Sequence, residues 1–127
     1  MRRTTTSAQP DSAAGLAAAA KARTELLLSG HMTMKTYLAS LTPSCASSMA
    51  NTPHYYVANM NAAFAKMADT ARKEHITITG VSTRAMGEDS ANSGRVWVHL
   101  STYQNHTNGW ELWKYVNGSW KNDACSP

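Results

Sequence analysis

Apolar residues recur every three or four positions through most of the first 73 residues and alternate with polar residues through much of the remainder. The first spacing is typical of one face of a helix, and alternation is typical of a strand with one buried face. The pattern predicts helices over residues 13–28, 33–41 and 53–73, with a loop over residues 43–48. Residues 1–10 have no such periodicity, and we expect a disordered lead there.

Residues at the ends of these segments support the predicted helices. Asp11 or Ser12 can cap the first helix, and Gly30 is placed to end it. Pro53 suits the first turn of the third helix. The apolar face of that helix is predicted to carry Tyr56, Met60, Phe64, Met67 and Ala71.

Strands are predicted over residues 75–81, 95–103, 110–116 and 119–124. Asn117-Gly118 separates the last two, and Asn-Gly between apolar runs is the strongest short signal for a tight hairpin. Helices followed by antiparallel strands indicate an α+β fold. We expect a single domain over residues 11–127, with three N-terminal helices packed on a curved four-stranded antiparallel sheet.

The chain has two cysteines, Cys45 and Cys125. Their spacing fits no zinc or redox motif, so they are either two separate buried thiols or a pair. A disulfide would tie down a C-terminal tail that is otherwise liable to fray. We therefore predict the Cys45–Cys125 bond, which favours an oxidising, extracytoplasmic location.

The formal net charge of +4 points at first to a nucleic acid or an anionic membrane. The basic residues are spread along the whole chain in runs of no more than two. This distribution argues against a nucleic-acid partner. The chain begins with a polar stretch and has no signal peptide or apolar membrane-spanning run. If the protein is exported, we expect its signal or anchor to lie outside these residues.

The C-terminal hairpin resembles that of the nuclear transport factor 2-like (cystatin-like, SnoaL-like) superfamily. The residues that carry the resemblance are Trp110, Leu112, Asn117, Gly118, Trp120 and Lys121, supported by Leu27-Leu28-Ser29-Gly30 and Tyr37-Leu38. The cysteine pair and the Ala/Thr/Ser-rich style look most like actinobacterial extracytoplasmic lipoprotein or Mce-associated domains. The resemblance implies a cone-shaped fold and leaves function open, because members include isomerases, cyclases, dehydratases, secretion scaffolds and binding modules.

Acid–base chemistry has few candidate residues in this sequence. His99 is the candidate general base, Tyr103 or Tyr56 the proton donor, and Asp69 or Glu111 the carboxylate that would orient the histidine. No pair of acids has the spacing of a catalytic dyad, and the histidines have no metal-binding spacing. A half-buried strand histidine on an aromatic surface is the simpler interpretation. We predict no metal and no cofactor.

The leading hypothesis is therefore a non-catalytic extracytoplasmic module that binds a partner protein or a small apolar ligand. The residues predicted to bind it are Tyr56, Met60, Trp97, His99, Tyr103 and Trp113. A scaffold subunit of a membrane-associated transport or secretion complex is the first alternative. A cofactor-free isomerase or cyclase that uses His99 is the second. We also consider a homodimer formed through the sheet.

Overall fold

A computed structural model gives the fold and describes residues 12–51, 57–87, 92–102 and 109–125. The helices are α1 (Ala13–Ser29), α2 (Met34–Ala39), α3 (Pro43–Ala50) and α4 (Val57–Lys73). The strands that follow are β1 (Ile78–Arg84), β2 (Ser93–Leu100), β3 (Glu111–Val116) and β4 (Ser119–Asn122). They form one antiparallel sheet in the order β1-β2-β3-β4. The predicted α+β class and the four-stranded antiparallel sheet are confirmed.

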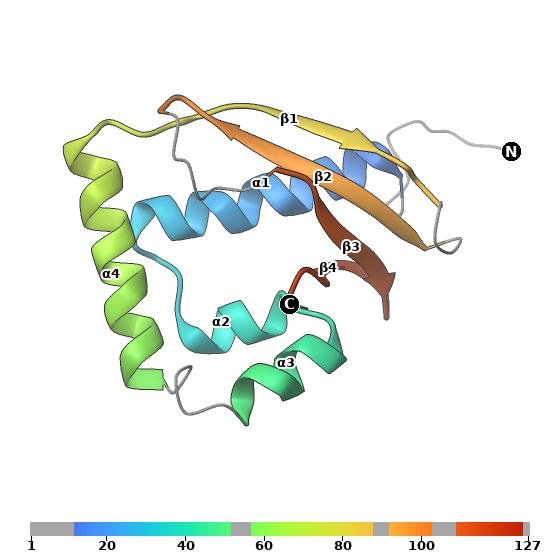
Figure 1. The fold of residues 1–127 in the computed structure, drawn as a ribbon, viewed down its shortest axis with the longest axis horizontal. Coiled ribbons are helices and arrows are strands. Elements are labelled where there is room, and N and C mark those ends of the chain that lie inside the picture. The colour runs from blue at the N-terminus through green and yellow to red at the C-terminus, as the bar shows by residue number, and fades with distance from the viewer. Residues whose placement is uncertain (1–11, 52–56, 88–91, 103–108, 126–127) are drawn as a thin grey trace, which may run out of the picture.

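Helix α1 lies across one face of the sheet, and α4 packs against α1 at one end of the molecule (Figure 1). Ser12 caps α1 by accepting a hydrogen bond from the Gly15 amide, and Gly30 ends it with a φ of 85°. Leu16 and Ala20 lie on the buried stripe of α1. They pack in the main core with Val96, Trp113 and Trp120.

The β4 edge of the sheet is covered by the chain between α2 and α3. The Asn122 amide donates to the Ser40 carbonyl at 2.8 Å, and the Thr42 amide donates to the Asn122 carbonyl at 2.9 Å. Leu41 and Asn122 thereby form a parallel bridge. Since unpaired strand edges are reactive toward other chains, this contact protects one edge of the sheet.

The predicted loop over residues 43–48 is wrong, because those residues begin α3. The Thr42 hydroxyl accepts a hydrogen bond from the Cys45 amide, and Pro43 occupies the first turn. Threonine at the cap and proline at the first helical position both favour a helix. The loop was predicted because the small, serine-rich segment that follows has weak helical propensity. The described residues therefore contain four helices before the sheet, where three were predicted.

The boundaries of all four strands also differ from prediction: β3 begins at Glu111 rather than at residue 110, and β4 ends at Asn122 rather than at residue 124. Strand β1 begins at Ile78 rather than at residue 75, because the positive φ of His75, 54°, interrupts the extended backbone. Strand β2 begins at Ser93 rather than Arg95 and ends at Leu100, so the predicted extension to residue 103 is only partly tested, since residue 103 lies outside the described ranges. The hairpin is confirmed: both turn residues, Asn117 and Gly118, have positive φ.

Helix α4 agrees with its predicted C-terminal end, whereas residues 53–56 of the prediction lie outside the described ranges. Its buried stripe is Phe64, Ala68 and Ala71. Met67, which was predicted to lie on the apolar face, is 44% exposed. The three buried positions are spaced by four and three residues, so Ala68 occupies the packed position beside Met67.

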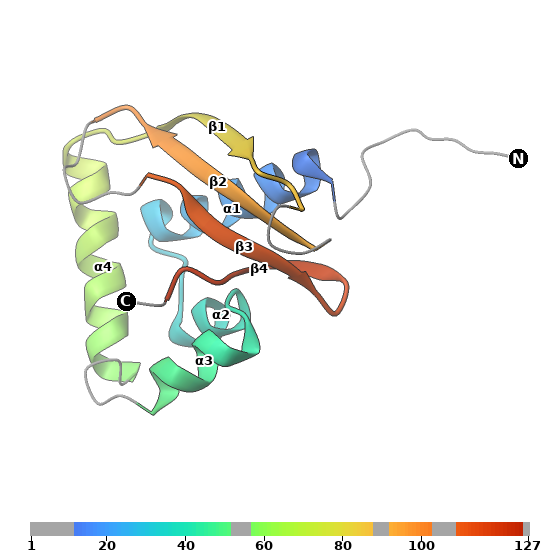
Figure 2. The ribbon, with the colours of Figure 1, turned by 45° about the vertical axis from the view of Figure 1, so that its right-hand side comes forward.

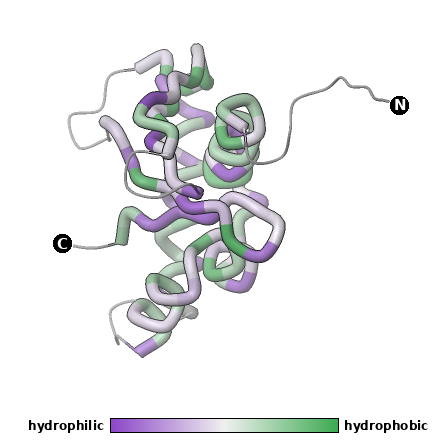
Figure 3. Tube along the Cα trace, turned by 90° about the vertical axis from the view of Figure 1, so that its right-hand side faces the viewer, coloured by the Kyte–Doolittle hydropathy of each residue, from purple (hydrophilic) through white to green (hydrophobic). Residues whose placement is uncertain are grey.

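No described helix combines the length and the apolar character that a membrane crossing requires. Figure 3 shows hydrophobic positions interspersed with hydrophilic ones along the described chain.

Candidate functional site

The strand register divides the sheet into a helix-facing side and an outer side. Val96 is 1% exposed in the core and lies opposite Glu111 on β3, so both side chains point toward the helices. Trp97 is the next residue of β2 and therefore points outward. It lies opposite Ser82 of β1. The same alternation places His99 on the outer side with Trp97.

The outer side carries a group of residues that we call the aromatic face: Ser82, Arg84, Trp97, His99 and Trp110. Trp97 and Trp110 pack edge to face with their ring centroids 5.7 Å apart. The Arg84 guanidinium carbon lies 4.1 Å from the centre of the Trp110 ring, within the range of a cation–π contact. Both tryptophans are half-buried.

No described helix packs on the aromatic face. Figure 2 shows β2 and β3 in front of α1, which covers the opposite side of the sheet. Among the described residues, the main helical contacts with β1 and β2 come from α1. The aromatic rings are therefore shielded by one another and by Arg84 rather than by a layer of helices.

His99 has no carboxylate partner among the described residues. Its Nε2 atom lies 2.8 Å from the Ser82 hydroxyl, and its ring packs 4.7 Å from that of Trp97. Asp69, on α4, is instead paired with Arg72 and Lys73. Glu111 is on the other side of the sheet, where it accepts a hydrogen bond from Asn122 at 3.2 Å. The structure thus separates His99 from both candidate acids.

Two of the predicted binding residues are on the helix-facing side. Met60 lines a partly open cavity of about 340 Å³ between the helices and the β3–β4 hairpin. Trp113 is buried against Arg23, which also lines this cavity, and its indole N–H has no hydrogen-bond partner among the described residues. The prediction for Trp97 and His99 concerns a different surface, the aromatic face. Tyr56 and Tyr103 lie outside the described residues.

Arg23 is the basic residue that lines the 340 Å³ cavity, which we call the helix-facing cavity. Its Nε atom donates to the Ser40 hydroxyl at 2.9 Å, and its guanidinium carbon lies 4.7 Å above the Tyr37 ring. The Trp113 ring centre is 5.9 Å from the same carbon. One feature of the sequence indicates this site: Arg23 is a charged residue within the helical stripe that also carries Leu16, Ala20 and Leu27. Arg23, Tyr37 and Asn122 were not among the predicted binding residues.

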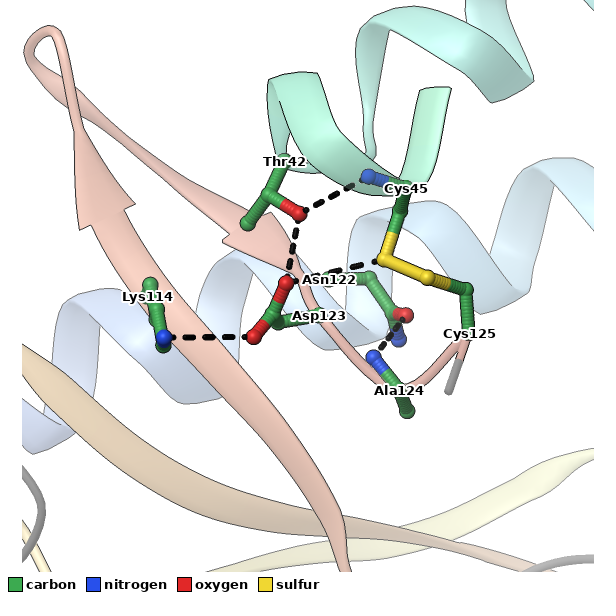
Figure 4. Close-up of a disulfide and its surroundings, with 7 residues drawn as sticks. All are labelled: Thr42, Cys45, Lys114, Asn122, Asp123, Ala124 and Cys125. Atoms are coloured by element: carbon green, nitrogen blue, oxygen red, sulfur yellow. Dashed lines mark hydrogen bonds and ion pairs between the residues drawn. A yellow bond between two sulfur atoms is a disulfide. The ribbon is translucent and has the colours of Figure 1, made fainter. Parts of the chain in front are cut away.

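The disulfide between Cys45 and Cys125 is present as predicted, with the Cα atoms 5.7 Å apart (Figure 4). It joins α3, rather than the predicted loop, to the residues that follow β4. Asp123 lies beside it, accepts a hydrogen bond from Thr42 and lies 3.4 Å from the Lys114 ammonium. Figure 4 shows these groups converging at the end of the hairpin.

Searches of protein-family models, of curated proteins and of solved structures found no match. The resemblance to the nuclear transport factor 2-like superfamily therefore stays a prediction. The described residues also contain no cluster of three or more histidine, cysteine, aspartate or glutamate side chains arranged to hold a metal ion.

Proposed function

We propose that this protein is a non-catalytic extracytoplasmic binding module that docks a partner protein on its aromatic face. One observation carries the proposal: Trp97 and Trp110 pack together on the side of the sheet that no described helix covers. Tryptophan and arginine are the residues most enriched among those that dominate binding energy at protein interfaces.

The composition of the aromatic face suits a protein partner. The two indole rings offer a large apolar area at a small cost in side-chain entropy, and their N–H groups can donate to a partner. Arg84 and His99 add polar contacts at its margin. A partner that covers the two rings would remove apolar surface from water, which favours association.

The disulfide supports the extracytoplasmic part of the proposal. Disulfides form and persist in oxidising compartments and are rare in the cytosol. The described part of the chain has Cys45 and Cys125 joined and no free cysteine. Expression with and without an oxidising compartment, followed by thiol titration, tests whether the bond forms only after export.

The position of His99 disfavours a proton-abstracting enzyme. A neutral histidine base is normally held in its reactive tautomer by a carboxylate. The described contacts of His99 are instead the Ser82 hydroxyl and the Trp97 ring. We therefore do not propose catalysis at this residue.

Crosslinking in the cells that produce the protein tests the proposal. The wild type is compared with Trp97→Thr and Trp110→Thr, which replace the indoles with a residue that suits strands. Met67→Gln is the control, because Met67 is an exposed apolar side chain on α4, away from the aromatic face.

We expect one crosslinked adduct with the wild type and Met67→Gln, and its loss with either tryptophan variant. Circular dichroism and thiol titration check that each variant keeps its fold and disulfide. An adduct of twice the mass would identify a second copy of the chain as the partner. Equal adduct yields from folded Trp97→Thr, Trp110→Thr and wild type would contradict the proposal.

A further inference from the structure

Two half-buried residues of opposite charge, Arg23 and Glu111, border the same cavities without forming an ion pair with one another. Arg23 and Glu111 both border the 340 Å³ cavity and a second cavity of about 160 Å³. Within the described chain, no Arg23 nitrogen comes within 4.0 Å of a Glu111 carboxylate oxygen. Both side chains are half-buried and keep unused hydrogen-bonding groups, so a polar ligand between them can bind both charges.

Arg23 keeps most of its hydrogen-bonding capacity available. Its Nε atom donates to the Ser40 hydroxyl. The guanidinium also packs over the aromatic rings of Tyr37 and Trp113, which orient its plane. Neither Nη group has a hydrogen-bond acceptor among the described residues. A guanidinium held in this way presents a fork of N–H donors that matches a carboxylate.

Glu111 is likewise only partly used. One carboxylate oxygen accepts from the Asn122 side chain, and Asn122 is itself fixed by hydrogen bonds to Ser40 and Ala124. The second oxygen has no donor among the described residues. Glu111 is thus positioned as an acceptor for a cationic or N–H group that enters the cavity.

The smaller cavity provides an apolar space next to these charges. Leu27, Leu28, Met67, Val98 and Leu100 line it, together with Arg23 and Glu111 at its junction with the larger cavity. A ligand bound between the two charges would therefore have an apolar wall for a side chain. The two cavities together fall within the size range of small-molecule pockets, about 300–1,000 Å³, and so have room for a molecule of one or two amino acids.

We propose that the helix-facing cavity binds a small zwitterion with an apolar side chain, of the size of one or two amino acids. The carboxylate faces the Nη groups of Arg23, the ammonium faces Glu111, and the side chain lies against the leucines of the smaller cavity. A zwitterionic ligand replaces the small apolar ligand that was predicted from the sequence. An apolar ligand would displace water from Arg23 and Glu111 without forming a hydrogen bond to either of them. A simple anion would satisfy Arg23 and be repelled by Glu111.

Ligand titration of the full, disulfide-bonded chain by NMR and calorimetry tests this site. The probes are leucine, methionine, phenylalanine and leucyl-leucine. N-acetyl-leucine lacks the ammonium, and leucinamide lacks the carboxylate. We expect saturable chemical-shift changes in β3 and α1 with at least one zwitterion. If leucine binds, N-acetyl-leucine and leucinamide should bind much more weakly.

Glu111→Gln is the decisive variant, because the glutamine oxygen can still accept from Asn122 while the negative charge is lost. It should weaken binding of the zwitterion at least about tenfold, since the ammonium loses its hydrogen bond to a charged carboxylate. It should also improve binding of N-acetyl-leucine relative to the wild type. Glu25→Gln and Lys21→Gln, which change exposed charges of α1, should leave the affinity unchanged.

Arg23→Lys is a second variant that keeps the positive charge and loses the forked geometry; it should weaken binding even where the fold is intact. Three results would overturn the proposal. They are no saturable shift with any zwitterion at millimolar concentration, an affinity that Glu111→Gln does not change, and leucinamide binding as tightly as leucine. These outcomes are independent of whether a protein docks on the aromatic face.

Discussion

Thr42 and Asp123 are joined by a hydrogen bond of 2.6 Å although 81 positions separate them in the sequence. The same Thr42 hydroxyl accepts from the Cys45 amide at the start of α3. One side chain therefore both caps a helix and holds the end of the C-terminal hairpin. This pairing explains how α3, which has weak intrinsic propensity, is stabilised by contacts distant in sequence.

We predict that Thr42→Val lowers the free energy of unfolding by about 1–3 kcal/mol. Valine keeps the shape of threonine and removes both the helix cap and the bond to Asp123, and buried polar groups that lose a partner are destabilising. Thr33→Val is the matched control, because Thr33 caps the exposed start of α2 and, among the described residues, forms hydrogen bonds only within its own turn. Urea unfolding measures the loss in the free energy of unfolding for both variants. Equal losses in the two variants would show that the Asp123 contact contributes nothing.

We predict that reduction of the Cys45–Cys125 bond lowers the free energy of unfolding by about 4 kcal/mol, the chain-entropy value for a loop of this length. The residues are 80 positions apart, and the bond closes a loop that includes α4 and all four strands of the sheet. Unfolding of the oxidised and reduced wild type gives the difference. The double variant Cys45→Ala with Cys125→Ala should match the reduced protein and should not respond to reductant. A reduced protein as stable as the oxidised one would contradict this account.

The features that the sequence predicts well are those set by local chemistry. Asn117 and Gly118 both adopt positive φ, as a two-residue hairpin turn requires, and Gly30 ends α1 in the left-handed conformation. The disulfide is also predictable, because Cys125 lies in a tail that would fray without it and Cys45 is the one other cysteine of the chain. Helix α3 is not, since its stability depends on Asp123 and Cys125, which follow it by about 80 residues.

The candidate site illustrates a different limit. Sequence alternation places Trp97 and His99 on one face, as the register shows, but it does not say which face the helices cover. Met60 and Trp113 were therefore grouped with Trp97 and His99, although they lie on the other side of the sheet. The approach of Arg23 and Glu111 to one cavity depends on how α1 crosses the sheet, which no local pattern encodes.

We predict that the pKa of the Asp69 carboxyl group lies below its ordinary value of 3.8. The hydrogen bond from Lys73 is the main cause, and the positive charges of Lys73 and Arg72 add to it. Because the folded pKa is lowered, the stabilisation is present above pH 3.8 and is lost as the pH falls through the folded value. NMR titration of the Asp69 carboxyl carbon measures the midpoint.

Lys73→Met should raise the titration midpoint of Asp69 toward 3.8. Lys35→Met, which removes an exposed cation on α2, should leave it unchanged. The side chains of Asp69 and Lys73 are 41% and 72% exposed, so salt should also shift the midpoint upward by screening the pair. A midpoint that neither Lys73→Met nor salt changes would contradict the stated cause.

We predict that Gly94→Ala destabilises the protein by about 1–3 kcal/mol, the usual cost of overpacking a core. A Cβ atom at this position would lie 2.9 Å from Leu16 Cδ2 and 2.6 Å from Met86 Sδ. Leu16 is fully buried and cannot move away, whereas Met86 is 39% exposed and can. The contact with Leu16 therefore determines the sign of the effect, and it also explains why β2 begins with a small residue against α1.

Gly80→Ala is the matched control for this prediction. Gly80 is in the neighbouring strand β1, and a Cβ atom there would have no neighbour within 4 Å. Alanine at this site should be neutral or slightly stabilising, because it restricts the unfolded chain without a clash. Adding Met86→Ala to Gly94→Ala should recover only part of the loss, since the contact with Leu16 persists. Equal unfolding free energies for Gly94→Ala and Gly80→Ala would show that α1 does not pack this closely on β2.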